Sequence, residues 1–124
     1  FTTALPPAVA AATRASLRIV RAEGWRRERV AALVARFRQR ATQQGLPLMP
    51  SSTPIQPVPV PGAAACAAAS AALMERGFWV SAIRHPTVPA GAERLRVTLS
   101  AAHDEAQVDA LVAALAEVLP EARA

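Results

Sequence analysis

The sequence predicts an α+β fold, in which a small, mainly antiparallel sheet has helices packed on one face and two helices precede it. Residues 94–99 alternate between polar and apolar side chains, which is the period of a strand with one buried face. Four other stretches have apolar residues at helical spacing or a high alanine content, and glycine and proline separate them. The resulting order is helix, helix, strand, helix, strand, strand, helix, which suits an open sheet covered by helices.

Glycine and proline mark the ends of the expected helices. Pro7 fits a first helical turn, where a missing N–H costs nothing, and Gly24 ends that helix. Asp104 and Gln107 have the spacing of a capping box at the start of the last helix, which Pro120 terminates. The four helices are expected over about residues 7–23, 25–44, 63–76 and 105–119.

Three strands are expected in the second half of the chain. The run 54–61 holds four prolines among its strand formers, so it is either an edge strand or an extended polyproline linker. Two further strands, about residues 79–83 and 94–99, flank a loop that contains two prolines and a glycine. Such a loop cannot continue either strand, but it can hold its side chains in a set place.

Length and composition favour one domain with a real core, since the chain has 124 residues and is 52% hydrophobic. A single cysteine allows no internal disulfide, no stretch is long and apolar enough to span a bilayer, and no signal-peptide pattern opens the chain. We therefore expect a cytoplasmic protein without a membrane partner. The chain opens on Phe1 instead of methionine, so we expect it to be a piece of a longer one.

All 14 basic residues are arginine, the net charge is +5, and nine arginines lie between residues 14 and 40. They are either the solvated faces of two helices or a nucleic-acid surface. The absence of tyrosine and asparagine, and of interleaved aromatic residues, favours solvated faces and no nucleic-acid partner. His85 and His103 lack the neighbouring ligands of a zinc site, and Cys66 lies among alanines, as a small buried residue does.

Arg84 and Arg96 differ from the arginines of the solvated helices because each lies in or beside a strand next to the rigid loop. A planar guanidinium binds a carboxylate through two hydrogen bonds and always stays charged, which suits the orientation of a small acid. The alternative is a structural salt bridge to Glu93, or a bond to a carbonyl group. The residues by themselves leave both interpretations open.

Similarity to a known family lies in the segment Ala82-Ile-Arg-His-Pro-Thr-Val-Pro-Ala-Gly-Ala-Glu-Arg-Leu-Arg-Val-Thr-Leu-Ser-Ala-Ala-His103. It resembles the C-terminal signature of the α-oxoamine synthases, pyridoxal-phosphate enzymes of fold type I. Three further segments match this family in the right order, residues 1–7, 54–57 and 77–80. The resemblance implies the C-terminal small domain of a fold type I transferase, with residues 1–46 linking a large cofactor domain to a small domain at residues 47–124.

The resemblance also implies a reaction and its participants. The match is best to the members that use L-alanine in biotin synthesis, and the glycine C-acetyltransferase and 5-aminolevulinate synthase types are the alternatives. Such an enzyme uses pyridoxal 5'-phosphate to condense L-alanine with pimeloyl-CoA or pimeloyl-ACP, with loss of CO₂, and works as a homodimer. The implied activity is that of a pyridoxal-phosphate-dependent C-acyltransferase.

Site residues follow from the same resemblance, position by position. Arg96 matches the arginine that binds the α-carboxylate of the amino acid, and Arg84 and Thr87 match residues that line the same mouth for substrate. Thr2 and Thr3 match the position from which one subunit of such a dimer sends a hydroxyl to the phosphate of its partner's cofactor.

The chain departs from the family pattern in having no lysine. It therefore cannot attach the cofactor covalently, and we expect these residues to be a C-terminal portion that is inactive alone and is preceded by a lysine-bearing cofactor domain. His85 stands where a proline is common in the alanine-using members, which bears on acyl specificity.

Overall fold

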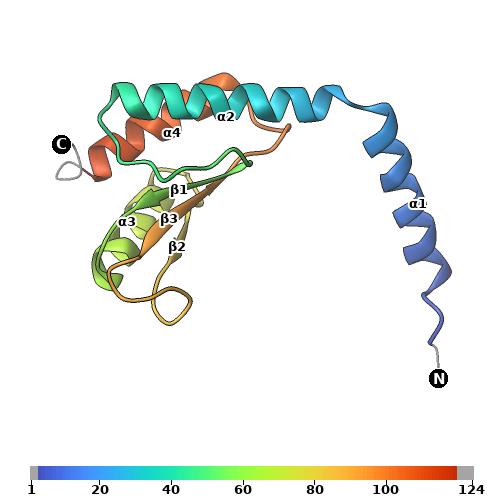
Figure 1. Ribbon diagram of the computed structural model, residues 1–124, viewed down its shortest axis with the longest axis horizontal. Helices are drawn as coiled ribbons and strands as arrows, with labels where there is room; N and C mark the ends of the chain where they lie inside the picture. The colour runs from blue at the N-terminus through green and yellow to red at the C-terminus, as the bar shows by residue number, and fades with distance from the viewer. Residues whose placement is uncertain (1–2, 120–124) are drawn as a thin grey trace.

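The structure is a computed structural model that describes residues 3–119, and its elements follow the expected order (Figure 1). The helices are α1 (Pro7–Ala22), α2 (Trp25–Gln43), α3 (Ala63–Glu75) and α4 (Glu105–Val118). The strands are β1 (Ile55–Pro59), β2 (Ser81–Ile83) and β3 (Arg94–Thr98). Helix boundaries lie within about a residue of those expected, so the predicted α+β class and element order are confirmed.

The three strands form one antiparallel sheet with β3 in the middle, in the order β1-β3-β2. The register sets Arg96 opposite Pro57 on one side and opposite Ser81 on the other. Because side chains alternate along a strand, Leu95 and Val97 are buried while Arg96 is exposed on the opposite face. The alternation read from the sequence therefore separates a core face from an open face.

The proline-rich run forms the edge strand β1, and the polyproline-linker alternative is not what the structure shows. Pro57 lacks an N–H, and its carbonyl accepts a hydrogen bond from the Met49 N–H at 3.2 Å, on the side away from β3. Proline on this side of β1 leaves few donors for another strand, which is how edge strands avoid unwanted pairing.

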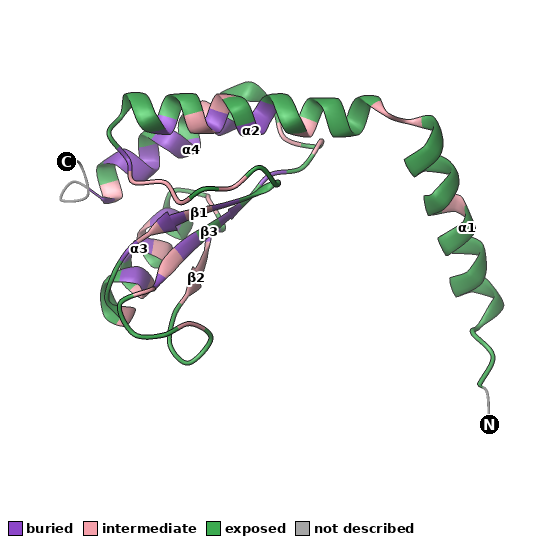
Figure 2. Ribbon diagram, viewed as in Figure 1, coloured by how far each residue is buried: buried purple, intermediate pink, exposed green. Residues whose placement is uncertain are grey.

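One apolar core lies between the sheet and three helices (Figure 2). Its fully buried side chains include Phe37 from α2, Leu73 from α3, Leu95 from β3 and Leu115 from α4. The C-terminal half of α2 thus shares a core with the sheet. By contrast, α1 contributes no buried residue and extends away from the rest of the molecule (Figures 1 and 2). No described helix is long and apolar enough to cross a membrane.

A surface ion-pair cluster also joins α2 to α4. Arg36 donates from Nε to Asp109 Oδ1 at 2.9 Å and from Nη2 to Asp109 Oδ2 at 2.6 Å. Its Nη1 lies 2.6 Å from Glu105 Oε2. The bidentate bond to Arg36 holds the pKa of Asp109 below its ordinary value.

We expect Asp109→Asn to lower the free energy of unfolding at neutral pH, because it removes the negative charge and one of the two acceptor oxygens of this bidentate bond. A carboxylate with a depressed folded pKa stabilises the fold above its unfolded pKa, and that contribution is lost as the pH falls through about 3.9 towards the folded pKa. Denaturant unfolding between pH 7 and pH 3 should show the gap between the two proteins narrowing below about pH 4. Glu117→Gln, which removes a more exposed carboxylate on α4, is the control.

Candidate functional site

Arg96 lies at the centre of the open face of the sheet. It is the middle residue of β3, and its neighbours across the strands, Pro57 and Ser81, carry no charge. Within residues 3–119 its guanidinium has no hydrogen-bond or ion-pair partner. The planar fork is therefore free to bind a carboxylate bidentately, on a backbone held by strands on both sides.

The loop at residues 84–93 brings Arg84 and Thr87 into one turn. The carbonyl of Arg84 accepts the Thr87 N–H at 2.9 Å, and both side chains are exposed. Ile83, the last residue of β2, pairs with Arg94 at the start of β3. Arg84 therefore leaves the sheet beside the strand that carries Arg96. Arg84 and Thr87 thus lie in the loop that joins β2 to β3, and Arg96 lies in the middle of β3. The substrate-binding roles of all three residues stay predictions.

Glu93 does not form the salt bridge that the sequence left open for the arginines. Its side chain is 3% exposed, and its Oε2 accepts the N–H of Gly62 at 3.0 Å and of Gly91 at 2.9 Å. These backbone bonds, that of Gly62 above all, hold the pKa of Glu93 below its ordinary value. Sequence reasoning missed this anchoring role, and the one available signal was an acidic residue two positions after a turn glycine.

The two N-terminal threonines are separate from this group. Thr2 lies outside the described residues, and Thr3 lies in the exposed segment before α1. That end of α1 is remote from the sheet in Figure 1. A single chain therefore does not bring Thr3 to Arg96, and the cofactor-binding roles of both threonines stay predictions.

Most arginines of α2 make contacts that hold the fold together. Arg29 donates from Nη2 to the carbonyl of His103 at 2.9 Å. Arg38 donates to Gln56 Oε1 at 2.8 Å, and Arg36 binds α4 as described. These contacts favour a structural role for the arginine-rich helix over a nucleic-acid surface.

The histidines and the cysteine show no arrangement for metal or nucleophilic chemistry. Among residues 3–119, no group of three or more His, Cys, Asp or Glu side chains could hold a metal ion. His103 Nδ1 accepts the Ser100 N–H at 3.1 Å, in the turn that precedes α4. Cys66 is buried, as predicted, and burial raises the pKa of its thiol.

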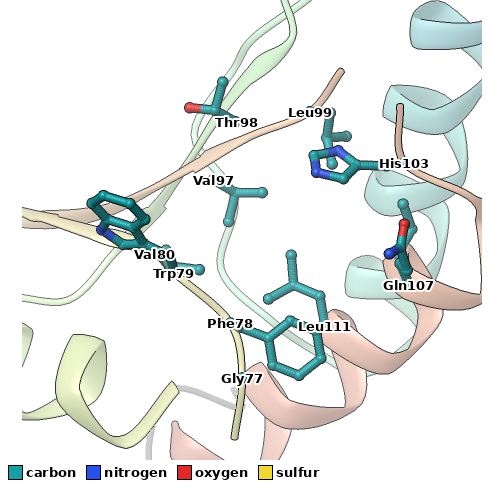
Figure 3. Close-up of a pocket in the computed structure, with 11 residues that line it drawn as sticks. Gly77, Phe78, Trp79, Val80, Val97, Thr98, Leu99, His103, Gln107 and Leu111 are labelled. Carbon is teal, nitrogen blue, oxygen red and sulfur yellow. The ribbon is translucent and has the colours of Figure 1, made fainter. Parts of the chain in front are cut away.

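A hollow of about 270 Å³ lies between the segment before β2, the C-terminal end of β3 and the start of α4 (Figure 3). Trp79 and Thr98 lie on one side of it, and His103, Gln107 and Leu111 lie on the other. Arg84, Thr87 and Arg96 are not among its lining residues. The three predicted substrate-binding side chains therefore lie on exposed surface and do not line this hollow.

Comparison with known proteins gives close relatives over the full length of the chain. A family model for aminotransferase class I and II matches residues 1–115. The 8-amino-7-oxononanoate synthase of Ectopseudomonas mendocina is 58% identical over 124 residues, which are all of this chain and 32% of that protein. The 8-amino-7-oxononanoate synthase of Pseudomonas fluorescens is also 58% identical over the same share of each chain. The chain thus spans about a third of the length of these curated relatives.

Solved structures show the same architecture. The Sphingomonas wittichii serine palmitoyltransferase superposes with a TM-score of 0.87 at 28% identity, over 98% of this chain and 31% of that one. The 8-amino-7-oxononanoate synthase of Francisella tularensis shares the fold, with a TM-score of 0.83 at 22% identity, over 98% of this chain and 35% of that one. The resemblance drawn from the segment 82–103 is confirmed, and the chain belongs to the aminotransferase class I and II family.

Proposed function

We propose that these residues form the C-terminal, substrate-binding part of a pyridoxal-phosphate-dependent acyltransferase. Its reaction is the decarboxylative condensation of L-alanine with a pimeloyl thioester to 8-amino-7-oxononanoate, a step of biotin synthesis in the cytoplasm. The observation that carries the proposal is Arg96, which is unpaired among the described residues on the open face of the central strand. The 58% identity to 8-amino-7-oxononanoate synthases supports this choice of substrates.

Arg96 binds and orients the α-carboxylate of alanine in this proposal. Two parallel N–H···O bonds from one guanidinium fix both the position and the plane of a carboxylate. When bound, pyridoxal phosphate supplies a conjugated ring that takes up the electron pair left at the α-carbon. The bond that breaks fastest stands perpendicular to such a ring, so the arginine selects the bond by holding the carboxylate.

Arg84 and Thr87 serve the acyl donor. A pimeloyl group ends in a second carboxylate, for which Arg84 provides a permanent positive charge. The turn between Arg84 and Thr87 presents a guanidinium and a hydroxyl donor from one short segment. The thioester carrier is either coenzyme A or acyl carrier protein.

The residues of this chain fit the substrate side of the site, and they do not fit the covalent attachment of the cofactor. No lysine is present, and the exposed Thr3 offers a hydroxyl for a phosphate group. We propose that the lysine belongs to a large domain that residues 1–46 connect to the small domain at residues 47–124. We further propose a homodimer in which Thr2 and Thr3 reach the phosphate in the partner subunit.

The test is an assay of the protein produced from the reading frame that contains this chain together with everything encoded upstream. We expect turnover of L-alanine with pimeloyl-CoA or pimeloyl-ACP, with 8-amino-7-oxononanoate detected by mass spectrometry. Preference for glycine with an acetyl or succinyl thioester would instead favour the other family types. Tight, steeply salt-dependent DNA binding without turnover would favour the nucleic-acid alternative, and a reading frame that starts at Phe1 would contradict the proposed upstream domain.

A further inference from the structure

We propose that Glu93 is a positioning residue for the loop that carries Arg84 and Thr87. Its loss would weaken binding of the acyl donor and leave binding of the amino acid on Arg96 nearly unchanged. This inference rests on the function proposed above and deepens it, because it names what places the acyl-donor side of the site.

Few apolar side chains of the loop at residues 84–93 pack against the rest of the molecule. Glu93 is its one buried residue, Val88 and Ala92 are half-buried, and the rest are exposed. A surface segment without buried apolar side chains opens easily unless polar contacts hold it. The buried carboxylate is therefore the main anchor of this loop.

Two backbone N–H groups from different parts of the chain converge on one oxygen of Glu93. Gly91 donates from the loop itself, and Gly62 donates from the residue just before α3. No side chain caps that helix end, so the carboxylate also supplies the negative charge that a helix N-terminus favours. The carbonyl of Glu93 accepts the Val60 N–H at 3.0 Å, so both its backbone and its side chain tie the loop to the segment that follows β1.

A series of turns extends this anchor back to the substrate-binding residues. The Ala92 N–H donates to the Pro89 carbonyl at 3.1 Å. The Thr87 and Val88 N–H groups donate to the Arg84 carbonyl at 2.9 and 3.4 Å. The loop is thus a set of hydrogen-bonded turns, and Glu93 fixes the end that leads into β3. Loss of the Glu93 contacts would free this end and shift Arg84 and Thr87 together.

Arg96 is held independently of that anchor. It lies in β3 between two paired strands, opposite Pro57 and Ser81. Sheet pairing on both sides keeps its backbone in place when the loop moves. Loss of Glu93 should therefore weaken binding of the acyl donor and not of the amino acid. A general loss of stability would weaken the binding of both substrates.

The experiment compares Glu93→Ala and Glu93→Gln in the complete enzyme, with Glu75→Ala as the control that removes an exposed carboxylate from α3. For Glu93→Ala we expect the KM for pimeloyl-CoA to rise about tenfold, as when a charged hydrogen-bonding group is removed. The KM for L-alanine and kcat should change less than about threefold. Glu93→Gln keeps a neutral acceptor, so its effect should be smaller. Backbone hydrogen exchange at Gly91 and Thr87 should accelerate in Glu93→Ala and not in Glu75→Ala.

Two outcomes would overturn the inference. One is an unchanged KM for pimeloyl-CoA in both Glu93 variants, and the other is an equal rise in KM for both substrates. If the unsubstituted enzyme does not convert alanine and pimeloyl thioester at all, the proposed function fails. Hydrogen exchange in the loop then decides by itself whether Glu93 positions Arg84 and Thr87. If Glu93→Ala does not fold, the same measurements on Glu93→Gln decide.

Discussion

Replacing Arg96 by alanine is expected to lower kcat/KM for L-alanine by about 100- to 10,000-fold in the complete enzyme, while pyridoxal phosphate still binds. Each charge-assisted hydrogen bond contributes about 1.5–3 kcal/mol, and the arginine offers two of them to one carboxylate. Steady-state kinetics with varied alanine measures the first effect. Absorbance titration with pyridoxal phosphate measures the second.

Two further substitutions sharpen this test. Arg96→Lys keeps the charge and loses the planar fork, so we expect an intermediate loss. Arg76→Ala removes an exposed arginine at the end of α3 and should leave alanine kinetics unchanged. Normal alanine kinetics in Arg96→Ala would refute the role of Arg96. Loss of cofactor binding that matches the loss of activity would point to a structural role instead.

The substitution Phe37→Ala is expected to lower the free energy of unfolding of this chain by about 3–5 kcal/mol. Phe37 is fully buried in the core that α2 shares with the sheet and the other packed helices. Removing its ring forfeits the apolar burial and leaves a cavity that neighbouring side chains fill only in part. Denaturant unfolding followed by circular dichroism gives the measurement.

The matched control is Leu17→Ala on α1, a side chain that is 51% exposed. A surface truncation of this kind should change the free energy of unfolding by about 0.5 kcal/mol or less. The two substitutions also compare the two helices within residues 1–46. In this chain α1 has no buried residue, while α2 packs on α4. A loss below about 1 kcal/mol for Phe37→Ala would contradict the place of α2 in the core.

Local patterns in the sequence predicted the elements because each pattern has a local physical cause. Alternation at residues 94–99 placed Leu95 inside and Arg96 outside, as the structure shows. Asp104 and Gln107 form both bonds of the capping box, at 2.8 and 2.9 Å, since the two residues lie within one helical turn. Such contacts span only a few residues, so spacing alone determines them.

The candidate site could be predicted only in part. The sequence, through its family resemblance, singled out Arg84, Thr87 and Arg96, and the structure places the first two in the loop between β2 and β3 and the third in the middle of β3. The sequence did not decide whether Glu93 neutralises the arginines. Its carboxylate instead bonds Gly62, which is 31 residues away along the chain. A pairing over that distance depends on where the turn before α3 packs against the loop, and no periodicity encodes it.

By itself, the sequence determined the α+β class, the order of the elements, the two faces of β3 and the family of the chain. Only the tertiary structure decided that the proline-rich run is the edge strand β1, that β3 lies between β1 and β2, and that Glu93 anchors the loop. The physical reason is that propensity and periodicity act over one or two turns of chain. Strand order and buried hydrogen bonds are set by contacts between distant segments, and these form only when the core closes.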